Sequence, residues 1–213
     1  NPETNTNIEL GFKADLLDNT LRLNAAAYLT KYENLQRAVV AVYTSADGSS
    51  QQETVTVNTG TSEIMGVDLE ATWVPTDNLR IGASINWLDH EYGAGSVLPD
   101  LRGGGAPVDL TQFDVPFSPE LKYGLNVAYD MPLSSGSRVT LQGDLNYQDI
   151  AETDVFNGQN TQMEKRTLVG LSTTWHAPDD RWSATVYGAN LTDETYRVAA
   201  LPVAGLWNFT NYG

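Results

Sequence analysis

Apolar residues occupy every second position along much of the chain. From Val67 to Trp73, and again from Leu79 to Trp87, each apolar residue is followed by a polar, charged or glycine residue. Successive side chains of a β-strand point to opposite faces, so this spacing indicates strands with one apolar and one polar face. Helical spacing is poor throughout the sequence.

The alternation predicts eight antiparallel strands, separated by turn-forming residues such as Asp18-Asn19 and Pro178-Asp179-Asp180. The fold class is therefore all-β. The expected strands span approximately residues 7–17, 20–32, 63–74, 79–92, 119–130, 138–150, 164–176 and 182–197.

Six of these strands separate apolar from charged residues almost completely. On one face 28 of 29 positions are apolar and none is charged, whereas nine of the 23 positions on the other face are charged. A shift of the pairing by one residue would move those charges to the apolar side, so the pattern specifies the register. The last two strands fit the alternation less cleanly.

Both a soluble β-sandwich and a transmembrane β-barrel contain strands of this kind. The expected strands have roughly ten residues or more, whereas strands of globular proteins most often have about 5 to 6. Short links of about two to seven residues alternate with long links of about 13 to 30. Outer-membrane barrels have this asymmetry, with short periplasmic turns and long extracellular loops. Three tryptophans flank short links, where an interfacial girdle is expected: Trp73, Trp175 and Trp182.

Charge and composition narrow the function classes. The formal net charge of -15 would repel a phosphate backbone, so nucleic acid is not expected as a partner. The absence of cysteine excludes disulfides and thiolate chemistry. No run of about 18 apolar residues is present, as a transmembrane helix would need. Barrel strands need only about 9 to 11 residues of alternating polarity, so the mean hydropathy of -0.31 is compatible with a barrel.

Four segments together resemble the TonB-dependent outer-membrane receptors of Gram-negative bacteria. "YGANLTDETYR", residues 187–197, resembles the penultimate-strand signature of that family. "NPETNTNIELGFKADLLDNTLRLNAAAYLTKYENLQ", residues 1–36, and "NTGTSEIMGVDLEATWVPTDNLRIGASINWLDHEY", residues 58–92, resemble its recurring hairpins. "FSPELKYGLNVAYDMPL", residues 117–133, is similar to a later one. The family-motif residues are Asn190, Leu191, Asp193 and Tyr196.

The resemblance implies that residues 1–213 are the C-terminal part of a receptor barrel, about eight strands of a barrel of about 22. The plug domain and the final strand would lie outside this segment. The implied function is active uptake of a scarce nutrient across the cell outer membrane, driven by the TonB complex through the plug region. Ferric siderophores are the commonest substrates of such receptors, and haem, cobalamin and oligosaccharides are others. The lipid of the outer membrane is the remaining expected partner.

No catalytic constellation is evident, so neither an enzyme nor a bound cofactor is expected. The two histidines, His90 and His176, lie too far apart along the strands to share a metal site with a short spacer. The outer loops supply the candidate ligand contacts, which are His90, Glu91, Tyr92, Arg102, Asp109 and Asp114. Asn190 and Asp193 are expected to hydrogen-bond local backbone rather than ligand.

Two alternatives remain at this point. A soluble β-sandwich that binds carbohydrate would bury Ile81, Ile85, Leu125 and Val127 under a second layer of the same chain. A complete eight-stranded outer-membrane barrel would close the eight strands on themselves.

Overall fold

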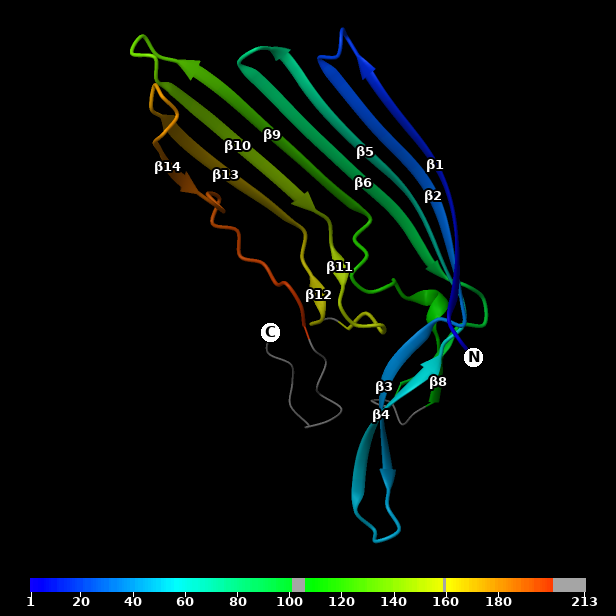
Figure 1. Ribbon diagram of the computed structural model, residues 1–213. Helices are drawn as coiled ribbons and strands as arrows, with labels where there is room; N and C mark the ends of the chain where they lie inside the picture. The colour runs from blue at the N-terminus through cyan, green and yellow to red at the C-terminus, as the bar shows by residue number, and fades with distance from the viewer. Residues whose placement is uncertain (101–105, 159, 201–213) are drawn as a thin grey trace.

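The protein forms one large antiparallel sheet with three small hairpins beneath it (Figure 1). The computed structural model describes residues 1–100, 106–158 and 160–200. Within them, no helix has the length and apolar character needed to cross a bilayer. The main sheet has eight strands, which neighbour one another in chain order: β1 (Thr4–Leu16), β2 (Leu21–Glu33), β5 (Ser62–Thr76), β6 (Leu79–Tyr92), β9 (Leu121–Pro132), β10 (Arg138–Gln148), β13 (Arg166–His176) and β14 (Ser183–Gly188).

The register of the sheet places the apolar positions on a common face, as the alternation predicts. Leu69 of β5 lies opposite Ala25 of β2 and Ile85 of β6. One residue earlier, Asp68 lies opposite Ala26 and Asn86 on the other face. Every neighbouring pair is antiparallel, so each ladder repeats this separation from strand to strand.

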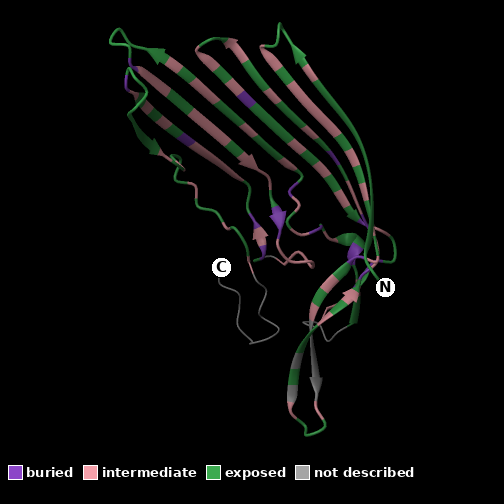
Figure 2. Cartoon of the chain, viewed as in Figure 1, coloured by how far each residue is buried: buried purple, intermediate pink, exposed green. Residues whose placement is uncertain are grey.

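No second layer of the described chain covers the apolar face. Ile85 and Leu125 are each 44% exposed, and Ile81 and Val127 are only partly covered. Figure 2 shows the same property along the whole sheet, where exposed and intermediate residues alternate and buried ones are rare. The β-sandwich alternative is therefore wrong, because it requires these four side chains to be core.

The sheet is open in the described part of the chain. β1 pairs only with β2, and β14 pairs only with β13. The closure expected of a complete eight-stranded barrel is thus not observed. An unpaired backbone group in hydrocarbon costs several kcal/mol, so both edges need further strands if the sheet lies in a bilayer.

Short turns join the strands at one end of the sheet. They span residues 17–20, 77–78, 133–137 and 177–182. The first turn holds Leu17, Asp18 and Asn19 at positive φ of 51, 54 and 66° and closes with a 3.1 Å bond from the Thr20 N–H to the Leu17 carbonyl. Asn and Asp tolerate this left-handed conformation better than most residues, which explains the Asp-Asn pair at this position.

The long links at the opposite end contain three hairpins that the sequence pattern did not predict. The first pairs β3 (Gln36–Thr44) with β4 (Ser50–Asn58), the second pairs β7 (Val97–Asp100) with β8 (Ala106–Asp109), and the third pairs β11 (Ala151–Glu152) with β12 (Gln162–Met163). A short 3-10 helix, η2 (Leu110–Gln112), follows β8. The long loops are therefore structured, not irregular.

A small hydrophobic core holds the first two hairpins against the end of β6. Its buried members are Leu35, Tyr92, Leu98, Leu110 and Val115. Figure 2 shows that most of the buried residues lie at this end of the molecule. The ring of Phe113 contacts that of Phe156 edge to face at 5.9 Å between centroids, which connects the third long link to the same core.

The last strand ends earlier than expected. β14 stops at Gly188, whereas the alternation predicted a strand to residue 197. Asn190 and Asp193 adopt positive φ of 50 and 52°, so a turn interrupts the strand. The Leu191 N–H still donates to the Val169 carbonyl at 2.9 Å, which keeps the chain beside β13.

A charge on the apolar face is expected to destabilise the intact protein strongly. Leu125→Arg should lower the free energy of unfolding in lipid vesicles by about 2–4 kcal/mol, the cost of arginine near the centre of a bilayer. Asn126→Arg is the matched control, because the neighbouring residue faces the polar side and should cost about 1 kcal/mol or less. Equal effects of the two substitutions would contradict the assignment of the faces.

Candidate functional site

The polar face of the sheet forms a charged wall. A hollow of about 480 Å³ lies against it where β5, β6, β9, β10 and β13 run side by side. Asn86 donates a short hydrogen bond to the Asp68 carboxylate, and Arg166 donates to Gln148 Oε1 at 3.1 Å. Hydrogen bonds thus link the polar side chains across neighbouring strands, and the wall suits contact with water or with another polar surface.

A second hollow lies at the long-loop end of this wall. It has a volume of about 140 Å³, and the end of β6 and the links before β9 and after β10 surround it. Four of its lining residues are carboxylates. The full lining is His90, Asp114, Ser118, Glu120, Asp149, Ile150, Ala151 and Glu152.

His90 joins β6 to the link that precedes β9. Its Nδ1 accepts the Val115 N–H at 3.3 Å, so Nε2 carries the proton and donates to the Ser118 carbonyl at 2.8 Å. Both ring nitrogens are therefore occupied by backbone. This geometry gives His90 a structural role at the hollow, in addition to its place in the lining.

Glu152 is the most buried carboxylate of the hollow, at 7% exposure. Its Oε1 accepts from Gln162 Nε2 at 2.7 Å, but Oε2 has no hydrogen-bond partner among the residues that the structure describes. Burial raises the pKa of Glu152, and the charges of Asp114 and Asp154 raise it further, while the bond from Gln162 opposes the shift. Nothing in the sequence distinguished Glu152 from the other loop acids.

The remaining candidate contacts are placed differently from one another. Tyr92 is 3% exposed and lies in the loop core, where its hydroxyl accepts from Arg37 Nη2 at 3.2 Å. Glu91 lies opposite Glu63, on the apolar side of the sheet by alternation. Asp109 is exposed and caps η2. Bonds from the Thr111 N–H and hydroxyl lower the pKa of Asp109. Arg102 lies outside the described residues.

The family-motif residues follow the end of β14. Asn190 accepts the Glu194 N–H at 2.9 Å and donates to the Glu194 carbonyl at 3.0 Å, which is local bonding of the expected kind. The ring of Tyr196 packs beneath the Arg166 guanidinium at 4.6 Å, and so contacts the polar wall. Leu191 and Asp193 are exposed.

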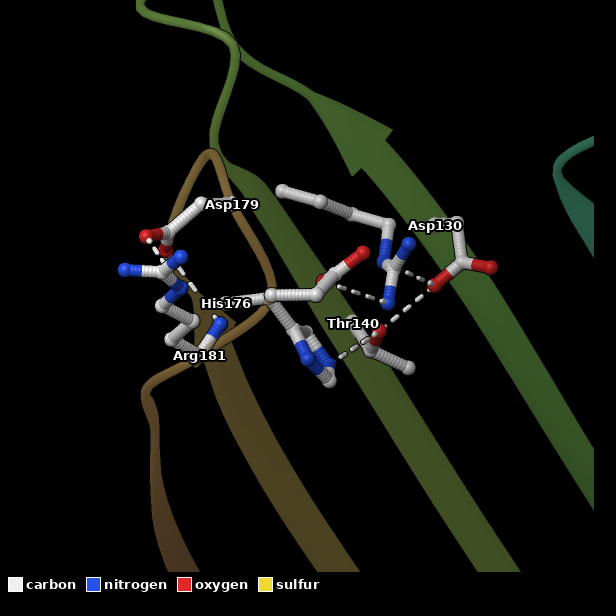
Figure 3. Close-up of polar contacts among 7 residues, drawn as sticks. Asp130, Thr140, His176, Asp179 and Arg181 are labelled. Carbon is white, nitrogen blue, oxygen red and sulfur yellow. Dashed lines mark hydrogen bonds and ion pairs between the residues drawn. The ribbon is translucent and has the colours of Figure 1, made fainter.

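The three tryptophans lie at the short-turn end. Trp73 and Trp175 are 40% and 41% exposed on the apolar face, and Trp182 is 74% exposed beside the last turn. Ion pairs also lie at this end: Arg138 pairs with Asp130 and Asp180, and Arg181 pairs with Asp179, near His176 (Figure 3). Thr140 donates to Asp130 at 2.5 Å and contacts His176 Nε2 at 3.4 Å. These contacts tie β9, β10 and β13 together.

The two histidines lie at opposite ends of the sheet, as expected. Among the described residues, no group of three histidine or carboxylate side chains could hold a metal ion.

His90→Phe should loosen the link before β9, because it removes two backbone contacts worth about 0.5–1.5 kcal/mol each. Hydrogen exchange of residues 113–120 in the intact protein, measured by mass spectrometry, should accelerate about tenfold. His176→Phe, at the other end of the sheet, should leave that segment unchanged. Unaltered exchange in His90→Phe would rule out this role.

Several known structures share the fold of this chain. The ferric yersiniabactin uptake receptor FyuA of Yersinia pestis matches 93% of this chain with a TM-score of 0.71 and 22% identity. The siderophore receptor PiuA of Acinetobacter baumannii matches 90% with a TM-score of 0.67 and 22% identity. The copper transporter OprC matches 92% with a TM-score of 0.61 and 16% identity. The chain spans about a quarter of each of these structures, at 26%, 25% and 26%.

A family model described as "TonB dependent receptor-like, beta-barrel" matches residues 1–191. Proteins of this family are transport receptors of the Gram-negative outer membrane and not enzymes. The apolar face of the sheet therefore meets the lipid of that membrane, and the polar face lines the lumen. The chain belongs to the TonB-dependent receptor β-barrel family.

Proposed function

We propose that this chain is the C-terminal part of the barrel of an outer-membrane receptor that takes up a scarce small-molecule nutrient. The observation that carries the proposal is the family match over residues 1–191. The open sheet supports it, since its apolar outer face and charged inner face are those of a wide barrel.

The structured outer loops supply the capture surface in this proposal. A hydrophobic core holds two hairpins and η2 together, and the pair of Phe113 and Phe156 joins the third long link to them. Loops ordered before binding lose less entropy when a ligand arrives, which favours tight capture at low concentration. Asp114 lines the hollow of about 140 Å³ and is the candidate contact best placed for this role, and His90 holds the neighbouring link in position.

Transport of a nutrient through the barrel lumen requires a movable domain that closes the lumen and a source of energy. We assign these roles to a plug domain and to the TonB complex, on the basis of the family. The hydrogen-bonded wall near Asp68, Asn86 and Arg166 suits a polar partner that slides or rearranges. The exposed tryptophans at the short-turn end suit the periplasmic interface, where indoles anchor a barrel.

A ferric siderophore is the proposed substrate. The receptors named above for ferric yersiniabactin and for siderophores share the fold of this segment. The copper transporter shares it too, so the fold alone does not select the cargo.

Uptake by intact cells tests the function. Deleting the gene that encodes this chain should reduce accumulation of radioactive iron at least tenfold for one or more members of a ferric siderophore panel. Restoring the gene should recover uptake, and a strain without TonB should not transport even with the gene present. Uptake of every panel member at the wild-type rate in the deletion strain would refute iron transport. Normal uptake without TonB would refute the energy coupling.

A further inference from the structure

Four carboxylates line the second hollow, the one at the long-loop end of the polar wall. Asp114, Glu120, Asp149 and Glu152 line it, and none of them forms an ion pair within the described parts of the chain. Asp149 Oδ1 accepts the Ile150 N–H at 2.8 Å, which is its own local backbone. Negative charges gathered around about 140 Å³ repel one another, and a bound cation would relieve that repulsion.

Glu152 provides a second, independent indication of a ligand. The residue is only 7% exposed and lines the hollow, and its Oε2 has no hydrogen-bond partner within the described ranges. A buried carboxylate oxygen without a partner is costly, and native proteins normally satisfy such atoms. The neighbouring His90 ring does not help, because its Nε2–H donates to the Ser118 carbonyl.

The geometry points to an organic cation and not to a metal ion. Among the described residues no three acidic or histidine side chains are arranged to hold a metal. A hollow of about 140 Å³ is also far larger than a dehydrated divalent ion needs. An ammonium or guanidinium group spreads several N–H donors over a wider space, which suits carboxylates that are farther apart.

The charge of the surrounding loops favours the approach of a cation. The three long links, residues 34–61, 93–120 and 149–165, contain ten acidic and three basic residues. A surface of one sign raises the local concentration of oppositely charged ligands and speeds their association.

We propose that this hollow binds an ammonium or guanidinium group carried by the transported nutrient, with Glu152 and Asp114 as its principal partners. This proposal rests on the proposed function, because the cationic group is taken to belong to the transported nutrient. The receptor then selects neutral or cationic complexes and discriminates against strongly anionic ones.

Binding of n-butylammonium to the intact receptor in a neutral detergent tests this site. Saturation-transfer NMR at pH 7.5 or so should give a dissociation constant at least about tenfold lower for n-butylammonium than for 1-butanol, its uncharged analogue. Glu152→Gln keeps the shape and the contact with Gln162, and should weaken n-butylammonium binding about tenfold. Asp114→Asn, on an exposed residue, should weaken it about threefold without affecting the fold.

Glu164→Gln is the matched control, because it removes one negative charge from the same link at an exposed residue outside the hollow. It should leave n-butylammonium binding within about twofold of the unmodified receptor. Equal binding of n-butylammonium and 1-butanol would overturn the proposal. So would equal losses in Glu164→Gln and Glu152→Gln, since the effect would then be general charge.

The pH dependence gives a separate readout. Because burial raises the pKa of Glu152, acidification should protonate Glu152 at a higher pH than an ordinary glutamate. n-Butylammonium affinity should therefore fall as pH is lowered through that raised pKa, and the fall should be shallower in Glu152→Gln. The other titratable groups that line the site are His90, Asp114, Glu120 and Asp149, and the charge of Asp154 also acts on Glu152. All five remain in both proteins.

The two proposals can fail separately. If the unmodified receptor transports ferric siderophores but binds n-butylammonium no more tightly than 1-butanol, the cation site alone is overturned. Retained selectivity in a receptor that transports no ferric siderophore would overturn the iron substrate and leave the cation site standing.

Discussion

The structure depends on one constraint, which is that a sheet with an almost entirely apolar face needs an apolar solvent. Leu69, Ile85 and Tyr123 lie in register on a face that nothing in the described chain covers. Water would make this exposure costly, at about 25 cal/mol for each Å². Lipid tails remove the cost, and they in turn require that every backbone group in the hydrocarbon be paired. The antiparallel ladders satisfy the inner strands, and the sheet edges at β1 and β14 are where the rest of a barrel belongs.

The loops at the outer end are stabilised differently from the main sheet. Water surrounds these loops, so a conventional buried core stabilises their structure. Leu98 and Leu110 belong to this core and are 2% and 0% exposed. His90 adds two polar contacts that connect this core to β6. The barrel wall thus supplies a rigid base, and the core makes the loops a defined surface on which charged side chains such as Glu152 keep fixed positions. A capture site for a scarce ligand benefits from both.

The sequence was sufficient for the strands and their register, because alternation is a local signal that a bilayer makes strict. It was insufficient where the signal is not local. The hairpin β3–β4 packs against a core that includes Leu98 and Leu110, which are distant in the sequence. The sequence of the hairpin alone therefore did not predict it. β14 ends at Gly188 because Asn190 turns the chain, which outweighed the apolar pattern beyond it. The raised pKa of Glu152 comes first from burial and then from the charges of Asp114 and Asp154, and no linear motif indicates this packing.

The most direct test of the lipid-facing sheet is a nitroxide scan of β6. Residues 1–213 contain no cysteine, so single cysteines introduced at residues 81–86 can each be spin-labelled in the intact receptor once any cysteine elsewhere in it is replaced by serine. In reconstituted membranes, collision with oxygen should be high and with a water-soluble nickel complex low at residues 81, 83 and 85. Residues 82, 84 and 86 should show a smaller ratio of oxygen to nickel collisions. A ratio without a period of two, or with the opposite phase, would contradict the account.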